Sequence, residues 1–299
     1  MTKDLIRAES LTMHFPLHKG LLANLFARQK AFVRAVDGVS FTIRKGEVLG
    51  LVGESGSGKT TTGRLILRLL EPTSGEVFYR GRSITSYTGI EMDDIREKMQ
   101  VIFQDPYASL SPRMSIGKAI AHPLEIHGIA AGSLARGMAE TMMEKVGLSP
   151  ASFLYRKYPH QVSGGQRQRV VIARALVTNP DFVVADEPIA MADVSVRAMI
   201  LELMVKLKEE FDLTYLFITH DLATCKYICD RIAIMYLGKI VEIGPLREVF
   251  GNPVHPYTRT LLDAVPGVPV SFEQRSVPLR EQYPDPVERA LAVLGSVRR

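Results

Sequence analysis

The chain has 299 residues, of which 46% are hydrophobic, and this provides ample material for the buried core of a globular protein. Its net charge of +5, from 37 basic and 32 acidic residues, permits a nucleotide, a lipid surface or a nucleic acid as partner without requiring one. The longest apolar stretches fall far short of the roughly 18 residues that cross a bilayer, and the N-terminus shows no secretory core, so we expect a cytoplasmic location.

Segments of alternating apolar residues predict strands, and segments with the period of a helix separate them. The predicted strands cover residues 5–15, 32–43, 47–52, 76–80, 99–103, 182–186, 215–219 and 232–236. The predicted helices cover residues 59–70, 115–128, 133–147 and 167–176. This alternation favours an α/β fold with a parallel sheet.

Two segments depart from the alternation. Between residues 104 and 163 the strand signal disappears, so we expect an inserted helical subdomain at about residues 105–165 of a main domain that covers 1–244. Prolines become frequent after residue 244, which predicts an irregular C-terminal extension over residues 245–299.

The chain has two cysteines, Cys225 and Cys229, whose spacing on a predicted helix places both on one face. They are either two small apolar side chains in a reduced compartment or two ligands of a metal half-site. Packing is the preferred interpretation, because reduced cysteines behave as small hydrophobic residues.

A glycine-rich loop follows the strand at 47–52 and opens the helix at 59–70. Glycines let successive backbone N–H groups converge on phosphate oxygens, and the helix terminus adds partial positive charge. Lys59 would supply a mobile cation and Thr60 a magnesium ligand, whereas an ordinary flexible turn needs no lysine. We therefore expect a nucleotide to bind at Gly53, Glu54, Ser55, Gly56, Ser57, Gly58, Lys59, Thr60 and Thr61.

The apolar strand at 182–186 ends in two carboxylates, Asp186 and Glu187. Acidic residues after a strand are common in surface loops, but beside a phosphate-binding loop they suit a magnesium ligand and a base. We expect Asp186 to serve the metal and Glu187 to serve the attacking water.

Ser163, Gly164, Gly165 and Gln166 precede the helix predicted at 167–176. Serine followed three residues later by glutamine fits a capping box, which is a purely structural role. Two glycines at a helix start also expose N–H groups that form a second anion site, and one nucleotide in this chain does not obviously require it.

These four residues resemble the signature of ATP-binding cassette proteins, and the order and spacing of all the motifs over residues 5–244 is similar to that family. The resemblance implies a P-loop NTPase (RecA-like) core with an antiparallel β subdomain and an inserted helical subdomain. It further implies ATP hydrolysis with Mg²⁺ and a head-to-tail pair with a second cassette ATPase, expected to be a different chain. In such a pair the signature of one cassette contacts the γ-phosphate held by the other.

The same resemblance assigns roles to single residues. Each of them, considered alone, could also have a purely structural role. Gln104 resembles the glutamine that senses Mg²⁺ and water, and His220 resembles the switch histidine that contacts the γ-phosphate. Phe15 is the candidate for stacking on adenine, and Asp193 stands in the inter-subunit loop. The sequence departs from the family pattern at Ala190, Ala192 and Val162, where serine, leucine and leucine are usual.

Residues 103–114 and 252–262 resemble the ATPase subunits of oligopeptide and dipeptide importers. This resemblance implies two transmembrane permease subunits, an extracytoplasmic solute-binding protein and a peripheral position on the cytoplasmic face of the membrane. Importers of nickel and of oligosaccharides belong to the same group and remain alternatives. Many relatives hold an iron–sulfur cluster with four cysteines in this extension, and since no cysteine follows Cys229 we predict no cluster.

A cassette ATPase that acts on nucleic acid is the rival interpretation, and the basic charge superficially supports it. About a hundred residues separate Thr60 from Ser163, too few for the long coiled coils or zinc modules that several such proteins insert there. We therefore expect no nucleic acid among the partners.

Overall fold

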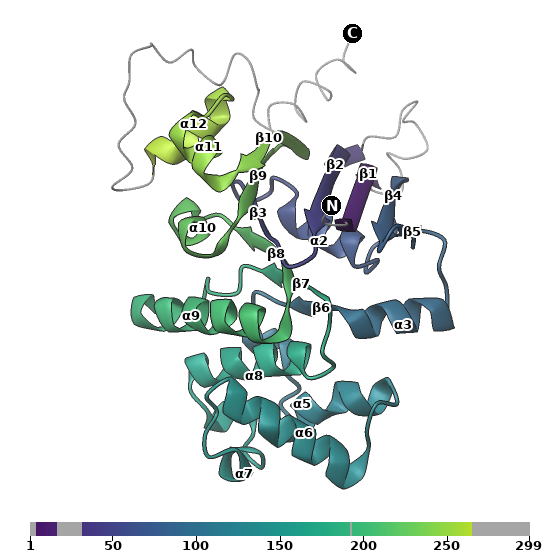
Figure 1. The fold of residues 1–299 in the computed structure, drawn as a ribbon, viewed down its shortest axis with the longest axis vertical. Coiled ribbons are helices and arrows are strands. Elements are labelled where there is room, and N and C mark those ends of the chain that lie inside the picture. The colour runs from purple at the N-terminus through teal and green to yellow at the C-terminus, as the bar shows by residue number, and fades with distance from the viewer. Residues whose placement is uncertain (1–3, 17–31, 192, 265–299) are drawn as a thin grey trace, which may run out of the picture.

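The computed structural model describes residues 4–16, 32–191 and 193–264, and within them a six-stranded sheet forms the centre of the fold (Figure 1). Its strand order is β10-β9-β3-β8-β7-β6. All neighbours in it are parallel except β10, which runs antiparallel to β9 at the edge. The strands are β3 (Val48–Val52), β6 (Met99–Ile102), β7 (Phe182–Asp186), β8 (Thr214–Thr219), β9 (Arg231–Tyr236) and β10 (Lys239–Pro245).

Burial on both faces explains why these short segments form parallel strands. Every residue of β3, β7 and β8 is buried, as expected for a sheet covered on both sides. Parallel strands also place all their carboxyl ends at one edge, where the loops that follow β3, β6, β7 and β8 come together.

A second, antiparallel sheet of order β2-β1-β4-β5 lies beside the first. It contains β1 (Asp4–Pro16), β2 (Phe32–Arg44), β4 (Ser74–Tyr79) and β5 (Arg82–Ser83). Helix α2 (Lys59–Ile66) contacts strands of both sheets, and its Leu65 and Ile66 share one apolar core with them. The helix ends at Ile66, four residues before the end of the predicted range 59–70, because Arg68 takes a left-handed backbone with φ of +52°.

The other face of the larger sheet is covered by helices. They are α8 (Gly164–Leu176), α9 (Val194–Phe211) and α10 (Leu222–Ile228), which share a second apolar core with the strands. Helix α3 (Ile90–Lys98) leads into β6. The segment between β6 and α8 contains α4 (Pro106–Ser109), α5 (Ile116–Ile126), α6 (Gly132–Lys145), α7 (Ala151–Leu154) and the short 3-10 helix Pro159–Gln161.

Helices α5, α6 and α7 lie at the end of the molecule opposite the C-terminal helices (Figure 1). The α/β fold with an antiparallel subdomain and an inserted helical subdomain is thus confirmed. Among the described residues, no helix has the length and apolar character required to cross a membrane.

The expected irregular extension is wrong for the residues that the structure describes after β10. Two helices form there, α11 (Leu246–Gly251) and α12 (Pro256–Asp263). Two of the prolines after residue 244 stand at helix starts: Pro245 is the N-cap of α11, and Pro256 lies in the first turn of α12. Proline is favourable at these positions because the first helical N–H groups have no partner within the helix.

The two cysteines pack against the central strand. Both are buried free thiols, and a Cβ added to Gly50 of β3 would lie 2.9 Å from Sγ of Cys229 and 3.4 Å from Sγ of Cys225. This placement favours the packing interpretation over a metal half-site.

Candidate nucleotide-binding site

The glycine-rich loop joins β3 to α2 and is enclosed by backbone on two sides. A Cβ on Gly53 would lie 2.1 Å from the carbonyl oxygen of Met235, and one on Gly58 would lie 2.2 Å from that of Ala35. Gly58 also has a φ of +106°, which other residues rarely adopt. These positions therefore require glycine, and the loop is held between the end of β9 and the strand β2.

Lys59 occupies the inside of this loop. Its Nζ donates hydrogen bonds to the carbonyl oxygens of Gly53 and Glu54, each at 2.7 Å, and the residue is only 5% exposed. Burial lowers the pKa of the Lys59 ammonium, whereas the nearby carboxylates of Glu187 and Asp186 raise it. Lys59 is thus a buried cation whose N–H groups donate to loop carbonyl oxygens. It can exchange these carbonyl oxygens for the oxygens of a phosphate.

Thr60 and Asp186 meet beside the lysine. Oγ1 of Thr60 donates to Oδ1 of Asp186 at 3.0 Å, and Asp186 is 7% exposed. Burial raises the pKa of the Asp186 carboxyl, and the hydrogen bond from Thr60 opposes this shift. A hydroxyl and one carboxylate fit the sparse protein ligand set of Mg²⁺ in nucleotide sites, where phosphates and water supply the other oxygens.

Two further predicted residues, Gln104 and His220, converge on one carboxylate oxygen of a third, Glu187. Oε2 of Glu187 accepts a hydrogen bond from Nε2 of Gln104 at 3.2 Å and lies 3.2 Å from Nδ1 of His220. Gln104 follows β6, Glu187 follows β7 and His220 follows β8, three strands that are consecutive in the sheet.

The backbone of Glu187 is strained in a way that fixes this position. Its φ is +47°, uncommon for a residue with a side chain, and its N–H donates to the carbonyl oxygen of Ile218 at 2.9 Å. Left-handed backbone at a non-glycine residue costs free energy, so the surrounding structure must hold Glu187 in this conformation.

The signature residues form the predicted capping box at the start of α8. Oγ of Ser163 accepts from the N–H of Gln166 at 3.2 Å, and the side chain of Gln166 accepts from the N–H of Ser163 at 3.0 Å. Gly164 and Gly165 complete the first turn of the helix, and space is open around Gly164. The serine hydroxyl thus stays at an exposed helix N-terminus, where an anion is favoured.

The two remaining predicted residues lie at the borders of described segments. Phe15 is near the end of β1, pairs with Val33 and is 37% exposed. Asp193 is the N-cap of α9, and its side chain makes no capping hydrogen bond. Ala192 and the insertion at 17–30 fall outside the described residues, so the structure adds nothing about their effect.

Two contacts near these motifs involve residues whose part in the site no local sequence pattern predicts. The guanidinium of Arg167 stacks on the ring of Tyr107 at 3.9 Å from its centroid and hydrogen-bonds the Tyr107 hydroxyl. The hydroxyl of Tyr257 in α12 accepts a hydrogen bond from the N–H of Glu54 at 3.1 Å. Their sequence separations, 60 and 203 residues, leave no periodic signal. The resemblance over 103–114 and 252–262 points to the segments of Tyr107 and Tyr257, but not to these contacts.

The fold and the site together define a P-loop nucleotide-binding domain of the α/β class. The chain belongs to the ABC transporter family, whose model matches residues 36–190. A second family model, the C-terminal region of oligopeptide/dipeptide transporters, matches residues 241–290.

Curated relatives carry one name in several organisms. The glutathione import ATP-binding protein GsiA of Escherichia coli is 50% identical over 264 residues, which are 88% of this chain and 41% of that protein. The GsiA protein of Salmonella typhimurium is 46% identical over 288 residues, 96% of this chain and 45% of that protein. The chain therefore spans less than half the length of these relatives.

Solved structures show the same architecture. A dimeric, post-hydrolysis structure of the ATP-binding cassette MJ0796 with ADP and Pi is 29% identical, with a TM-score of 0.69. The match covers 81% of this chain and 99% of that one. The cbiO1 protein of Clostridium perfringens, part of the cbiONQ transporter complex, is 25% identical, with a TM-score of 0.69. That match covers 84% of this chain and 92% of the cbiO1 chain.

Proposed function

We propose that this chain binds and hydrolyses ATP to drive import of a peptide-type solute through a multi-subunit transporter. The observation that carries the proposal is the convergence of Gln104 and His220 on Glu187, next to the Thr60–Asp186 pair and the loop closed by Lys59.

Each side chain then has a role that its contacts support. Lys59 binds phosphate oxygens in place of the loop carbonyls of Gly53 and Glu54, and the remaining loop residues from Ser55 to Thr61 surround the phosphates. Glu187 accepts the proton of the attacking water, and Gln104 and His220 hold its carboxylate in position. Mg²⁺, held by Thr60, Asp186 and Gln104, would neutralise charge on the phosphates.

The second half of each catalytic site would come from another cassette ATPase. Ser163, Gly164, Gly165 and Gln166 form an anion-binding helix start that would contact the γ-phosphate held by the partner, with Asp193 in the loop between subunits and Phe15 against the adenine. The dimeric state of the MJ0796 cassette supports this arrangement. We expect the partner to be a different chain.

The transporter assignment rests on the C-terminal match and on the relatives. The match to the oligopeptide/dipeptide transporter region and the glutathione import proteins favour a peptide-type cargo, of which glutathione is a small example. Two transmembrane permease subunits and an extracytoplasmic solute-binding protein would complete the machine. The chain would then act as a peripheral protein on the cytoplasmic face of the membrane.

Nucleotide titration of the full chain and of Lys59→Ala tests the first step. We expect the variant to lose at least tenfold in ATP affinity, because it removes the buried cation of the loop. Lys206→Ala, which removes an exposed lysine of α9, is the matched control and should bind as the parent does. Equal affinity of Lys59→Ala and the parent protein would refute the proposal.

A further inference from the structure

Helix α12, the last helix that the structure describes, is attached to the edge of the larger sheet just before its first turn. The carboxylate of Glu242 in β10 accepts hydrogen bonds from the N–H groups of Val254 and His255, at 2.9 and 3.0 Å. Nδ1 of His255, the N-cap, accepts from the N–H of Tyr257 at 3.2 Å. The backbone at Tyr257 is therefore fixed relative to β10.

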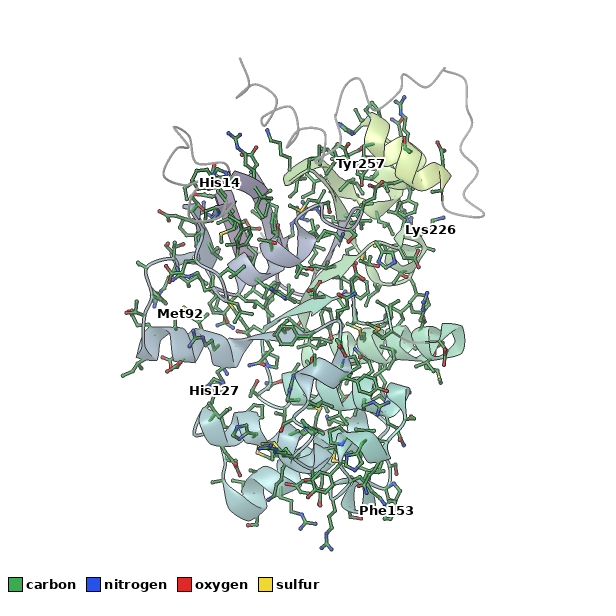
Figure 2. All side chains as sticks on the ribbon, turned by 180° about the vertical axis from the view of Figure 1, so that it is seen from behind. His14, Met92, His127, Phe153, Lys226 and Tyr257 are labelled. Carbon is green, nitrogen blue, oxygen red and sulfur yellow. The ribbon has the colours of Figure 1, made fainter. Side chains whose placement is uncertain are left out.

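The side chain of Tyr257 points from this helix into the protein, beside the larger sheet (Figure 2). It is 2% exposed, and its ring packs on that of Tyr236, at the end of β9, with 4.2 Å between centroids. Burial raises the pKa of the Tyr257 phenol to about 12, so the group is a neutral hydrogen-bonding partner at physiological pH.

The hydroxyl of Tyr257 reaches the first turn of the phosphate-binding loop. It accepts from the N–H of Glu54 at 3.1 Å, and the carbonyl oxygen of the same peptide group, that of Gly53, accepts from Nζ of Lys59 at 2.7 Å. A phosphate that binds Lys59 takes the strongest donor away from that carbonyl. The hydrogen bond to the Tyr257 hydroxyl is then a contact from outside the loop that keeps the Gly53–Glu54 peptide group in place.

We propose that Tyr257 is a positioning residue for the phosphate-binding loop, through which the C-terminal segment sets the nucleotide affinity of the chain. This inference rests on the proposed ATP binding. It makes α12 part of the nucleotide site, although the helix contributes no side chain that the motifs of the loop require.

Tyr257→Phe tests the proposal because it keeps the packed ring and removes the hydroxyl. In the full chain we expect the Kd for ATP to rise about fivefold, which corresponds to ~1 kcal/mol. The amide of Glu54 should exchange its hydrogen faster, and the Tm should stay within about 2 °C of the parent, since the exposed loop can hydrogen-bond water instead. Tyr227→Phe, at an exposed tyrosine of α10, is the matched control and should change neither affinity nor exchange.

Glu242→Ala is the second variant, since it releases the start of α12 without touching the ring or the loop. It should raise the Kd in the same direction. Unchanged affinity and exchange in Tyr257→Phe would overturn the inference, and so would a fall in Tm with unchanged affinity, which indicates a packing role alone. If the parent and Lys59→Ala bind ATP equally weakly, the proposed function fails, while the exchange at Glu54 still reports whether the Tyr257 bond forms.

Discussion

Oε2 of Glu187 lies 3.2 Å from Nδ1 of His220, and this contact joins the ends of the neighbouring strands β7 and β8. Glu187 is mostly buried, with 17% of its side chain exposed, whereas the His220 side chain is 60% exposed. The histidine therefore contacts the carboxylate from the solvent side, where a γ-phosphate and an attacking water would arrive.

His220→Ala should reduce ATP turnover by about 100-fold, because in the proposed mechanism it removes a group that positions the base and contacts the γ-phosphate. The affinity for ATP should change less than about threefold, since the loop and Lys59 remain. Phosphate release by the assembled transporter measures the first effect and nucleotide titration the second. His127→Ala, in the helical region far from the site (Figure 2), should leave both unchanged, and full turnover in His220→Ala would remove the histidine from the mechanism.

Asp186→Asn should stabilise the protein while it weakens magnesium-dependent nucleotide binding. The folded-state pKa of the Asp186 carboxyl is raised by burial, so its contribution to stability is present at acid pH and is lost as the pH rises through that pKa. Asparagine avoids this cost at neutral pH and still accepts from Thr60, so we expect the Tm to rise by ~2 °C. Asp94→Asn at an exposed site of α3 should not shift the Tm, and a lower Tm in Asp186→Asn would contradict the argument.

Arg167 fixes the start of α8 against the segment that follows Gln104. It is 8% exposed, stacks on Tyr107 and donates to the carbonyl oxygen of Pro159 at 2.8 Å. Arg167→Lys loses the planar stacking and should cost about 2 kcal/mol in the free energy of unfolding, measured with urea.

Tyr107→Phe keeps the stacked ring of this pair and should cost less than half as much. The exposed Arg156→Lys is the control for the chemistry of the exchange. A free energy of unfolding in Arg167→Lys equal to that of the control would show that the stacked pair does not stabilise the fold.

His255 should make the docking of α12 sensitive to acid. Burial lowers the pKa of its imidazole from 6.5, and the carboxylate of Glu242 opposes the shift. The unfolded chain then binds more protons than the folded one below pH 6.5, so this stability is fully present above that value and is lost as the pH falls through the lowered pKa. Protonation also removes the Nδ1 acceptor of the cap.

His255→Asn keeps an acceptor at the N-cap and cannot titrate. We therefore expect a smaller fall in Tm between pH 7 and pH 5 in this variant than in the parent. The measurement is a series of thermal melts across this range, with His127→Asn as the control that keeps the parental profile. Identical profiles for the parent and His255→Asn would contradict the role of the imidazole.

The central sheet could be predicted because its strands are short apolar runs followed by the residues that carry the chemistry. Asp186 and Glu187 directly follow a fully buried strand, and the capping box at Ser163 is visible as a local pattern. Such signals act over a few residues, so the sequence alone reveals them. The roles of these residues in catalysis stay predictions.

Other features depend on contacts between distant segments. The bond between Tyr257 and Glu54 spans 203 residues, and no local pattern encodes it. The left-handed backbone of Glu187 is imposed by its place between β7 and Ile218, not by its side chain. The prolines after residue 244 predict irregular structure, but Pro256 lies in the first turn of α12, a position that accepts proline.

Glu187→Gln in the assembled transporter tests the central claim most directly. The amide keeps the size of the side chain and can still accept a hydrogen bond from Gln104, but it cannot take a proton from water. With ATP binding retained, we predict phosphate release at least about 100-fold slower than in the parent and in Glu209→Gln, an exposed control in α9. Turnover in Glu187→Gln at the rate of the parent protein would contradict the account.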